Sequence, residues 1–368
     1  MKICSPQLGL SPTSSLGGEI YDYETLKGFS KKGIKVYIYL PKGRNYDKNL
    51  KNFYVTYSFL RHVVPPWLYS FICLPYLFKT YKKEKFDILR IHSPRFLGIA
   101  AIIFHFFYPD VPILTSAVTP KESRLLYIVE KKIYQISSKI IVQSQYMKSR
   151  LHITFNLPLK KIAVTYGGVV NNIKVYPKKS KADISRPSSD KILLFMGVLN
   201  KRKNPLFLVE VLKKVSTERP QIKLVLIGTG EQKNDVKKAL DKNNLSQKAL
   251  FIDSAYEQKK AFWLNKMDIF VLPSLDEGLG LSLLEAMSAG KPAVVSNIPP
   301  FKEIIENAKD GFTLPLNVNI WAKTIVELLK DARLKSQIGQ KAKLKVRELF
   351  TWERMYQLNA QVVTKMVK

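Results

Sequence analysis

Cysteine and histidine are scarce in this chain of 368 residues, which contains two cysteines and four histidines. Cys4 and Cys73 are too few for a disulfide framework, and such usage is typical of a chain in a reducing cytosol. The scattered histidines offer no ligand set, and no Asp-x-Asp motif occurs in the chain. The sequence therefore predicts that no metal is bound.

Long apolar runs are also missing. Residues 63–78 are interrupted by three prolines, and the apolar run Phe96 to Tyr108 contains His105. Both runs fall short of the roughly twenty residues that a membrane-spanning helix requires. The N-terminal MKICSP enters a strand without the apolar core of a signal peptide. We therefore expect a cytoplasmic protein without a membrane span.

Acidic residues are few, since 29 Asp and Glu face 60 Lys and Arg, giving a net charge of +31. More than half of this excess falls within residues 1–180. Such a charge suits nucleic acid, anionic lipid or nucleotide-phosphate substrates. The alternative is a lysine-rich surface that is merely solvated. No recognition helix, RNP-type strand or zinc module is evident, so a nucleic-acid-binding function rests on charge alone.

Apolar residues are abundant, at 46%, and the length favours two domains. Two successive series of strands alternate with helices, one beginning at Lys2–Ser5 and the other at Ile192–Met196. Residues 176–190, which contain prolines, lysines and serines, read as the linker between them. This alternation predicts an α/β protein with two Rossmann-like domains. The expected parts are residues 1–180, residues 181–350 and a last helix over 351–368.

The stretch Phe270 to Ser296 predicts a strand, a loop, a helix, a turn and a second strand. Phe270–Leu272 is a buried strand, and the loop after it contains two glycines and two carboxylates. The helix runs over Leu281–Ala289 and ends at Gly290. A glycine-bearing loop that opens a helix at the end of a strand is typical of anion sites. The alternative is an ordinary βαβ unit whose glutamates are solvated.

Two glutamates frame this loop, Glu277 before the helix and Glu285 inside it, with EGLGL at the front and LEAM at the back. This pattern resembles the donor-binding signature of the retaining glycosyltransferases of family 4, and departs from it at Leu279, where the family usually has an aromatic residue. The resemblance implies the GT-B fold, with two Rossmann-like domains facing each other across a cleft. It further implies a nucleotide-sugar site on the second domain, an acceptor site on the first, and a C-terminal helix that crosses back to the first. No cofactor or metal is implied.

The resemblance also assigns roles around the loop. Glu277 would be the catalytic residue, contacting the donor sugar and supporting positive charge at the anomeric carbon. Glu285 would accept hydrogen bonds from the ribose hydroxyls. Backbone contacts to the sugar and phosphates would come from Gly278, Gly280 and Leu281.

A second motif is Gly197-Val198-Leu199, followed by Lys203-Asn204-Pro205. It resembles the Gly-Arg-Leu and Lys-Asn-Pro elements of the family, whose arginine and lysine grip the diphosphate. Val198 stands in the place of the arginine, so Lys203 remains and Arg202 is the candidate for the second cation. The alternative is that both are solvated side chains.

Four further elements resemble family positions, and a fifth position, Ala117, departs from the family. Gly17 and Gly18 would lie in an N-terminal loop near the donor phosphates and the acceptor, and His92 would lie beside the acceptor. Tyr256 would lie near the nucleotide base. Ala117 stands where many members carry a second histidine. The pair of glycines at 228 and 230 fits a Gly-x-Gly turn.

The predicted function is transfer of a sugar from a nucleotide-diphosphate sugar to a lipid-linked or surface-glycan acceptor at the cytosolic membrane face. The aromatic stretch Phe53–Tyr81 ends in Lys82, Lys83 and Lys85. It indicates peripheral attachment to an anionic membrane surface, on the inner face of the plasma membrane. The alternatives are a soluble small-molecule acceptor, a basic nucleic-acid-binding protein, and a Rossmann oxidoreductase, which would lack a well-formed G-x-G-x-x-G fingerprint.

Overall fold

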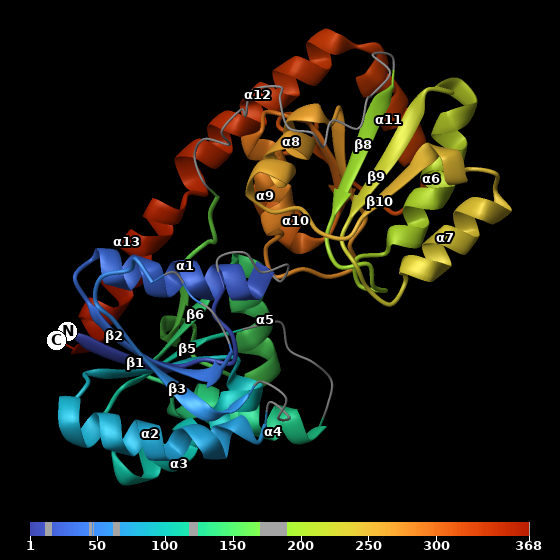
Figure 1. Cartoon of the computed structure of the whole chain (residues 1–368). Coiled ribbons are helices and arrows are strands. Elements are labelled where there is room, and N and C mark those ends of the chain that lie inside the picture. The colour runs from blue at the N-terminus through green and yellow to red at the C-terminus, as the bar shows by residue number, and fades with distance from the viewer. Residues whose placement is uncertain are drawn as a thin grey trace. The chain divides into compact units, whose positions relative to one another are not determined.

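The chain forms two compact units (Figure 1). The computed structural model describes residues 1–11, 17–43, 46, 48–61, 67–117, 124–169 and 190–367. The first unit comprises Met1–Gly167 and Trp352–Lys368, and the second comprises Gly168–Thr351. The predicted boundary between residues 180 and 181, and nearly all of the predicted linker, lie outside the described residues.

The first unit is built on a seven-stranded sheet with the order β3-β2-β1-β4-β5-β6-β7, in which every neighbouring pair is parallel. The order reverses between β1 and β4, so the carboxyl ends of these two strands flank the switch point where α/β sheets bind ligands. The strands are β1 Lys2–Pro6, β2 Lys35–Lys42, β3 Phe53–Arg61, β4 Ile88–His92, β5 Ile113–Ser116, β6 Lys139–Val142 and β7 Ile162–Val164.

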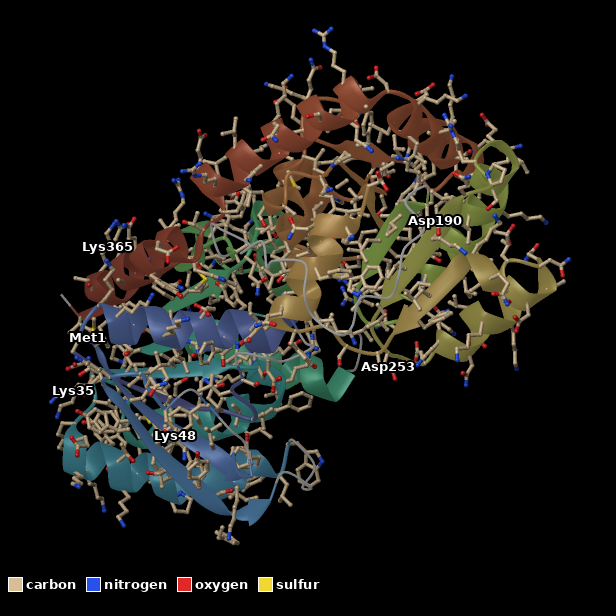
Figure 2. The ribbon with its side chains drawn as sticks, turned by 45° about the horizontal axis from the view of Figure 1, so that its top comes forward. Met1, Lys35, Lys48, Asp190, Asp253 and Lys365 are labelled. Atoms are coloured by element: carbon tan, nitrogen blue, oxygen red, sulfur yellow. The ribbon has the colours of Figure 1, made fainter. Side chains whose placement is uncertain are left out.

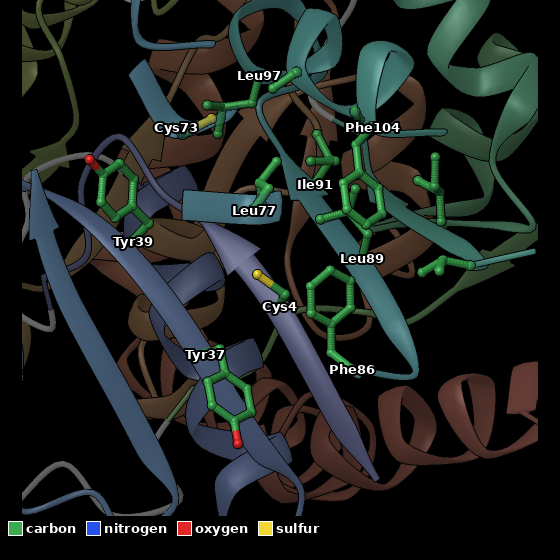
Figure 3. Close-up of a cluster of buried hydrophobic side chains, with 14 of the residues drawn as sticks. Cys4, Tyr37, Tyr39, Cys73, Leu77, Phe86, Leu89, Ile91, Leu97 and Phe104 are labelled. Atoms are coloured by element: carbon green, nitrogen blue, oxygen red, sulfur yellow. The ribbon is translucent and has the colours of Figure 1, made fainter. Parts of the chain in front are cut away.

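Helices cover both faces of this sheet, because its strands alternate apolar side chains between the two faces. Ile3 and Ile88 pack toward α1 and α13, whereas Cys4 and Leu89 pack toward α2 and α3 in the aromatic-rich cluster of Figure 3. Cys4 and Cys73 are both buried and free. The helices are α1 Gly17–Lys31, α2 Tyr69–Glu84, α3 Pro94–Phe107, α4 Arg124–Ile136, α5 Gln145–Phe155 and α13 Trp352–Val367.

The last helix completes the first unit, as predicted. Helix α13 lies along α1, and a Cβ atom at Gly28 would lie 2.4 Å from Cδ1 of Tyr356. The Tyr356 hydroxyl donates a hydrogen bond to the Glu24 carboxylate. Val363 is fully buried and joins the core beneath α1. The prediction that the C-terminal helix returns to the first domain is therefore confirmed.

The second unit is built on a six-stranded parallel sheet with the order β10-β9-β8-β11-β12-β13. Its switch point lies between β8 and β11. The strands are β8 Lys191–Met196, β9 Ile222–Ile227, β10 Ala249–Ile252, β11 Ile269–Leu272, β12 Ala293–Ser296 and β13 Phe312–Leu314. The helices are α6 Pro205–Glu218, α7 Lys233–Lys242, α8 Glu257–Lys266, α9 Leu281–Ser288, α10 Pro299–Ile304, α11 Val318–Lys330 and α12 Ala332–Leu349.

Two details differ from the sequence-based expectations. Gly17 and Gly18 form the first turn of α1 and not the end of a loop, because the helix begins at Gly17. The stretch 52–81, to which no elements were assigned, contains strand β3 and most of helix α2. Pro75 is tolerated inside α2 because it lies on the exposed side of the helix, where water can satisfy the carbonyl group that it leaves unpaired.

Candidate active site

The loop between β11 and α9 carries Glu277 and is shaped by glycine. Gly280 has a φ of 100° and directly precedes α9. A Cβ atom there would lie 2.7 Å from Cε1 of Phe301, so both the backbone conformation and the packing require glycine. The side chain of Leu279 lies in the core, since the residue is only 1% exposed. The free N–H groups at the start of α9 therefore lie beside the loop that holds Glu277.

Glu277 is held by two cations from the loop after β8. Its Oε2 lies 2.9 Å from Nη1 of Arg202, and its Oε1 accepts a hydrogen bond from the Lys203 ammonium. The Ser274 hydroxyl also donates to Oε1, at 3.0 Å. Glu277 and Lys203 are buried, whereas the Arg202 side chain is 42% exposed. Because β8 and β11 flank the switch point, this ion cluster lies at the edge where open α/β sheets generally bind ligands.

The cluster keeps Glu277 ionised. Burial alone would raise the pKa of its carboxyl group, but the charges and hydrogen bonds of Lys203 and Arg202 outweigh burial and hold that pKa below its usual range. One carboxylate and two cations therefore lie together, largely buried, where the loop after β8 meets the loop after β11. Such a group can stabilise both a developing positive charge and a diphosphate.

The loop after β8 is fixed to the end of β9. The N–H of Leu199 donates to the carbonyl of Thr229 at 2.8 Å. A Cβ atom at Gly228 would lie 2.0 Å from the carbonyl oxygen of Gly197, and one at Gly230 would lie 2.3 Å from that of Leu199. The two glycines are therefore required by close backbone approach. This contact fixes the loop that leads to Lys203.

Two further candidates of this unit lie around helix α8. Glu285, on α9, accepts a hydrogen bond at 2.6 Å from Nζ of Lys260, on α8. Tyr256 precedes α8 and is 41% exposed, one helical turn from Lys260. Lys260 was not among the predicted site residues, because nothing in the sequence indicates that α8 lies beside α9. Gly278 directly follows Glu277 in the loop, and Leu281 is the first residue of α9.

The first unit has a buried polar cluster at its own switch point. His92 ends β4, and its Nδ1 lies 3.3 Å from Oδ1 of Asp22 in α1. The same carboxylate oxygen lies 2.5 Å from Nη2 of Arg90. Arg90 also donates to the hydroxyls of Ser116, at 2.9 Å, and Ser5, at 3.3 Å. The sequence prediction included His92 but missed Asp22 and Arg90.

The other predicted positions of this unit have simpler surroundings. Gly17 and Gly18 are exposed, and among the described residues no atom lies within 4 Å of a Cβ built at Gly18, so their packing does not require glycine at that position. Ala117 is buried and packs with the core beside α4 and α5. Within the described parts of the chain, no group of three or more His, Cys, Asp or Glu side chains could hold a metal ion.

Comparison with known proteins identifies the family. Residues 16–171 match the family model described as Glycosyltransferase Family 4, and residues 178–345 match the one described as Glycosyl transferases group 1. The Escherichia coli UDP-Gal:alpha-D-GlcNAc-diphosphoundecaprenol alpha-1,3-galactosyltransferase is 29% identical over 276 residues, which are 69% of each chain.

Solved structures agree on the fold. Sucrose-phosphate synthase from Thermosynechococcus elongatus has a TM-score of 0.84 at 17% identity, covering 99% of this chain and 98% of its own. Anabaena Alr3699/HepE in complex with UDP and glucose has a TM-score of 0.80 at 17% identity, covering 99% and 100%. The predicted family and fold are thus confirmed. The chain belongs to the glycosyltransferases of family 4, retaining enzymes that transfer a hexose from a nucleotide sugar, and it has the GT-B fold.

Proposed function

We propose that this enzyme transfers a sugar from a UDP-sugar, bound by the second domain, to a lipid-linked acceptor bound by the first domain at an anionic membrane surface. The ion cluster of Arg202, Lys203 and Glu277 carries the proposal, because it sets two cations and a carboxylate at the switch point beside the start of α9. The relative from Escherichia coli and the HepE complex, whose names include UDP-Gal and UDP, support a uridine nucleotide.

The cluster suits the chemistry of sugar transfer. Negative charge builds up on the diphosphate as the glycosidic bond breaks, and Lys203 and Arg202 stabilise that charge. Glu277 contacts the sugar hydroxyls and supports the oxocarbenium-like positive charge at the anomeric carbon. The leaving phosphate accepts the proton of the acceptor hydroxyl on the same face of the sugar, which retains the anomeric configuration.

Gly280 and its neighbours complete the donor site in this proposal. The backbone N–H groups of Gly278, Gly280 and Leu281 lie in the loop and first turn of α9, where they can donate to sugar and phosphate oxygens. On donor binding, Glu285 exchanges its hydrogen bond from Lys260 for hydrogen bonds from the ribose hydroxyls. The exposed ring of Tyr256 lies near the base.

The donor proposal is tested by calorimetry with UDP, GDP and ADP in the presence of EDTA. We expect UDP to bind most tightly, and to bind without a divalent metal. A transfer screen with UDP-sugars and lipid-linked or soluble sugar acceptors then follows. Tight binding of GDP or ADP in place of UDP would contradict the choice of base, and transfer to soluble acceptors alone would contradict the lipid-linked acceptor.

The membrane part of the proposal rests on helices α2 and α3. Phe106 and Phe107, at the end of α3, are 80% and 60% exposed, and the ring of Phe107 lies 5.5 Å from that of Phe78 in α2. The exposed Lys82 and Lys83 end the same helix. Exposed aromatic rings beside lysines suit an anionic lipid surface, where each basic residue contributes about 1 kcal/mol.

Other features of this domain are consistent with peripheral attachment. Trp67, two residues before α2, and Phe71, in its first turn, are 52% and 46% exposed. Lysines elsewhere on the first unit, such as Lys35 and Lys365, also lie on its exposed surface (Figure 2). Among the described helices, none is long and apolar enough to cross a membrane. The acceptor named for the Escherichia coli relative carries diphosphoundecaprenol, which is a lipid.

Vesicle flotation tests the membrane proposal. Binding to anionic vesicles should fall with added salt, and should weaken when Lys82, Lys83 and Lys85 are replaced by glutamate. The matched control replaces three exposed lysines of the second unit, Lys213, Lys214 and Lys238, by glutamate, with the same change in net charge. Equal weakening in both triple variants, or no flotation at low salt, would contradict a docking surface on the first domain.

A further inference from the structure

The polar cluster at the end of β4 contains two opposite charges that the sugar-transfer scheme does not use. Asp22 is 1% exposed and Arg90 is 0% exposed, and Arg90 lies within a strand whose five residues are all buried. Burying an ion pair is costly unless its geometry is good and its remaining polar groups are satisfied. The two serine hydroxyls satisfy part of the Arg90 guanidinium. A fully buried ion pair at the ligand-binding edge of a sheet therefore calls for a functional explanation.

His92 is the residue that this ion pair faces. The Asp22 carboxylate lies between the two, with Oδ1 at 2.5 Å from Nη2 of Arg90 and 3.3 Å from Nδ1 of His92. Nδ1 and both carboxylate oxygens of Asp22 are buried atoms without a hydrogen-bond partner among the described residues. The 3.3 Å contact between Nδ1 and Oδ1 is therefore not aligned as a hydrogen bond, and catalytic contacts are often long or poorly aligned without substrate.

Burial keeps the imidazole of His92 neutral. Burial lowers the pKa of His92 most strongly, and the positive charge of Arg90 adds to this, whereas Asp22 and Glu19 act in the opposite direction. Arg90 thus offsets the attraction that Asp22 alone would exert on an imidazolium. A neutral imidazole has one N–H group and one nitrogen that accepts a hydrogen bond.

A carboxylate only accepts hydrogen bonds, so the ring nitrogen that faces Asp22 must be the one that carries the proton. We propose that Asp22, neutralised by Arg90, is a positioning residue that fixes the proton of neutral His92 on Nδ1. Nε2 is then presented as a hydrogen-bond acceptor for a hydroxyl of the acceptor substrate. The last step rests on the proposed function, since it requires that the acceptor bind on the first domain; the assignment of the tautomer does not.

Nuclear magnetic resonance of protein labelled with ¹⁵N-histidine tests the tautomer directly. His92→Gln identifies the resonances of His92 among those of the four histidines. At neutral pH we expect the imidazole of His92 in the wild-type protein to carry its proton on Nδ1. The double variant Asp22→Leu/Arg90→Met replaces both charged side chains by apolar side chains of similar volume. Folded proteins often tolerate such a replacement of a buried ion pair. In this variant we expect a large loss of the Nδ1–H tautomer.

The matched control removes another buried arginine–carboxylate pair of the same domain. Nε of Arg95 lies 2.8 Å from Oε1 of Glu130, and both side chains are buried. Arg95→Met/Glu130→Leu should leave the His92 tautomer unchanged. The same shift of the tautomer in both double variants would overturn the specific role of Asp22, as would a wild-type proton on Nε2.

Kinetics tests the consequence for the substrate. In Asp22→Leu/Arg90→Met we expect the acceptor KM to rise by about tenfold, the effect of one lost hydrogen bond, with donor affinity unchanged. An unchanged acceptor KM together with a lost Nδ1–H tautomer would overturn the role of Nε2 in acceptor binding. A failure of the proposed function gives a different result: the wild-type protein would not bind the nucleotide, but its His92 proton would still lie on Nδ1.

Discussion

Replacing Glu277 by glutamine removes the charge of the buried carboxylate and almost nothing else. Glutamine has the same size, and its amide oxygen can still accept the hydrogen bond from Ser274. Lys203, which is 9% exposed, loses its counter-ion in a buried environment. Arg202 is nearly half exposed, so its side chain can turn toward water. The variant therefore separates the charge of Glu277 from its packing.

The magnitude follows from this geometry. Two unit charges about 4 Å apart attract by about 4 kcal/mol at an effective dielectric constant near 20, and the desolvation of both ions offsets much of that. Removing one partner of a buried pair costs about 3–5 kcal/mol, and we expect the lower end because water screens Arg202. A unit of this size loses about 2–4 °C in Tm per kcal/mol, so Tm should fall by roughly 6–12 °C. Transfer should fall by at least about 100-fold.

Stability and turnover are both measured, because each tests a different step. Calorimetry gives Tm, and product formation from a UDP-sugar gives kcat. The pKa of Glu277 is depressed from its ordinary 4.5, so its contribution to stability is present above pH 4.5 and is lost as pH falls through the folded-state pKa. The stability difference between wild type and Glu277→Gln should therefore shrink below pH 4.5.

A surface carboxylate provides the control. Glu306 pairs with Lys309 at 2.9 Å, and both side chains are more than half exposed. Glu306→Gln should leave turnover unchanged and Tm close to that of the wild type. Transfer at the wild-type rate in folded Glu277→Gln would remove Glu277 from the mechanism. A stability difference that persists at low pH would refute the ion-pair argument.

Three further predictions address other parts of the molecule. Lys203→Ala should weaken nucleoside diphosphate binding far more than acceptor binding, and a larger loss in Arg202→Ala would assign the diphosphate mainly to Arg202; calorimetry measures both. Burial raises the pKa of Glu130 to about 7, against the opposing effect of Arg95, so the free energy of unfolding should fall as pH rises from 4.5 to 7. Chemical denaturation should find this slope absent in Glu130→Gln. Gly28→Ala should destabilise the first unit by about 1–3 kcal/mol, because its Cβ would overlap the Tyr356 ring; an unchanged Tm would contradict this.

The stretch from Phe270 to Ser296 could be predicted from sequence because its signals are local. A buried strand, a glycine loop and a glycine-terminated helix each depend on neighbouring residues, and the structure has β11, α9 and β12 at nearly those positions. The contact of Arg202 with Glu277 joins residues 75 positions apart. Nothing in the local pattern predicts such a contact, although the parallel order of β8 and β11 makes it possible.

The missed ion pair left a signal in the sequence. Arg90 interrupts the apolar strand Ile88–His92, and a charged residue at a buried strand position needs a partner. Asp22 lies one turn before Leu26 and two turns before Phe29 on the inward face of α1. Two opposite charges at buried positions of neighbouring elements are the pattern to search for.

Helix α13 has a consequence for how the protein is made. The first domain is assembled from two segments of chain, and the second segment is synthesised only after the whole second domain. Met355 and Val363, both fully buried, belong to α13, so the face of the first sheet that it covers stays incompletely covered until residues 352–367 emerge. Domains generally fold during synthesis in their order along the chain. Here the second domain should reach its native state first, and the nascent first domain is the part that chaperones must protect.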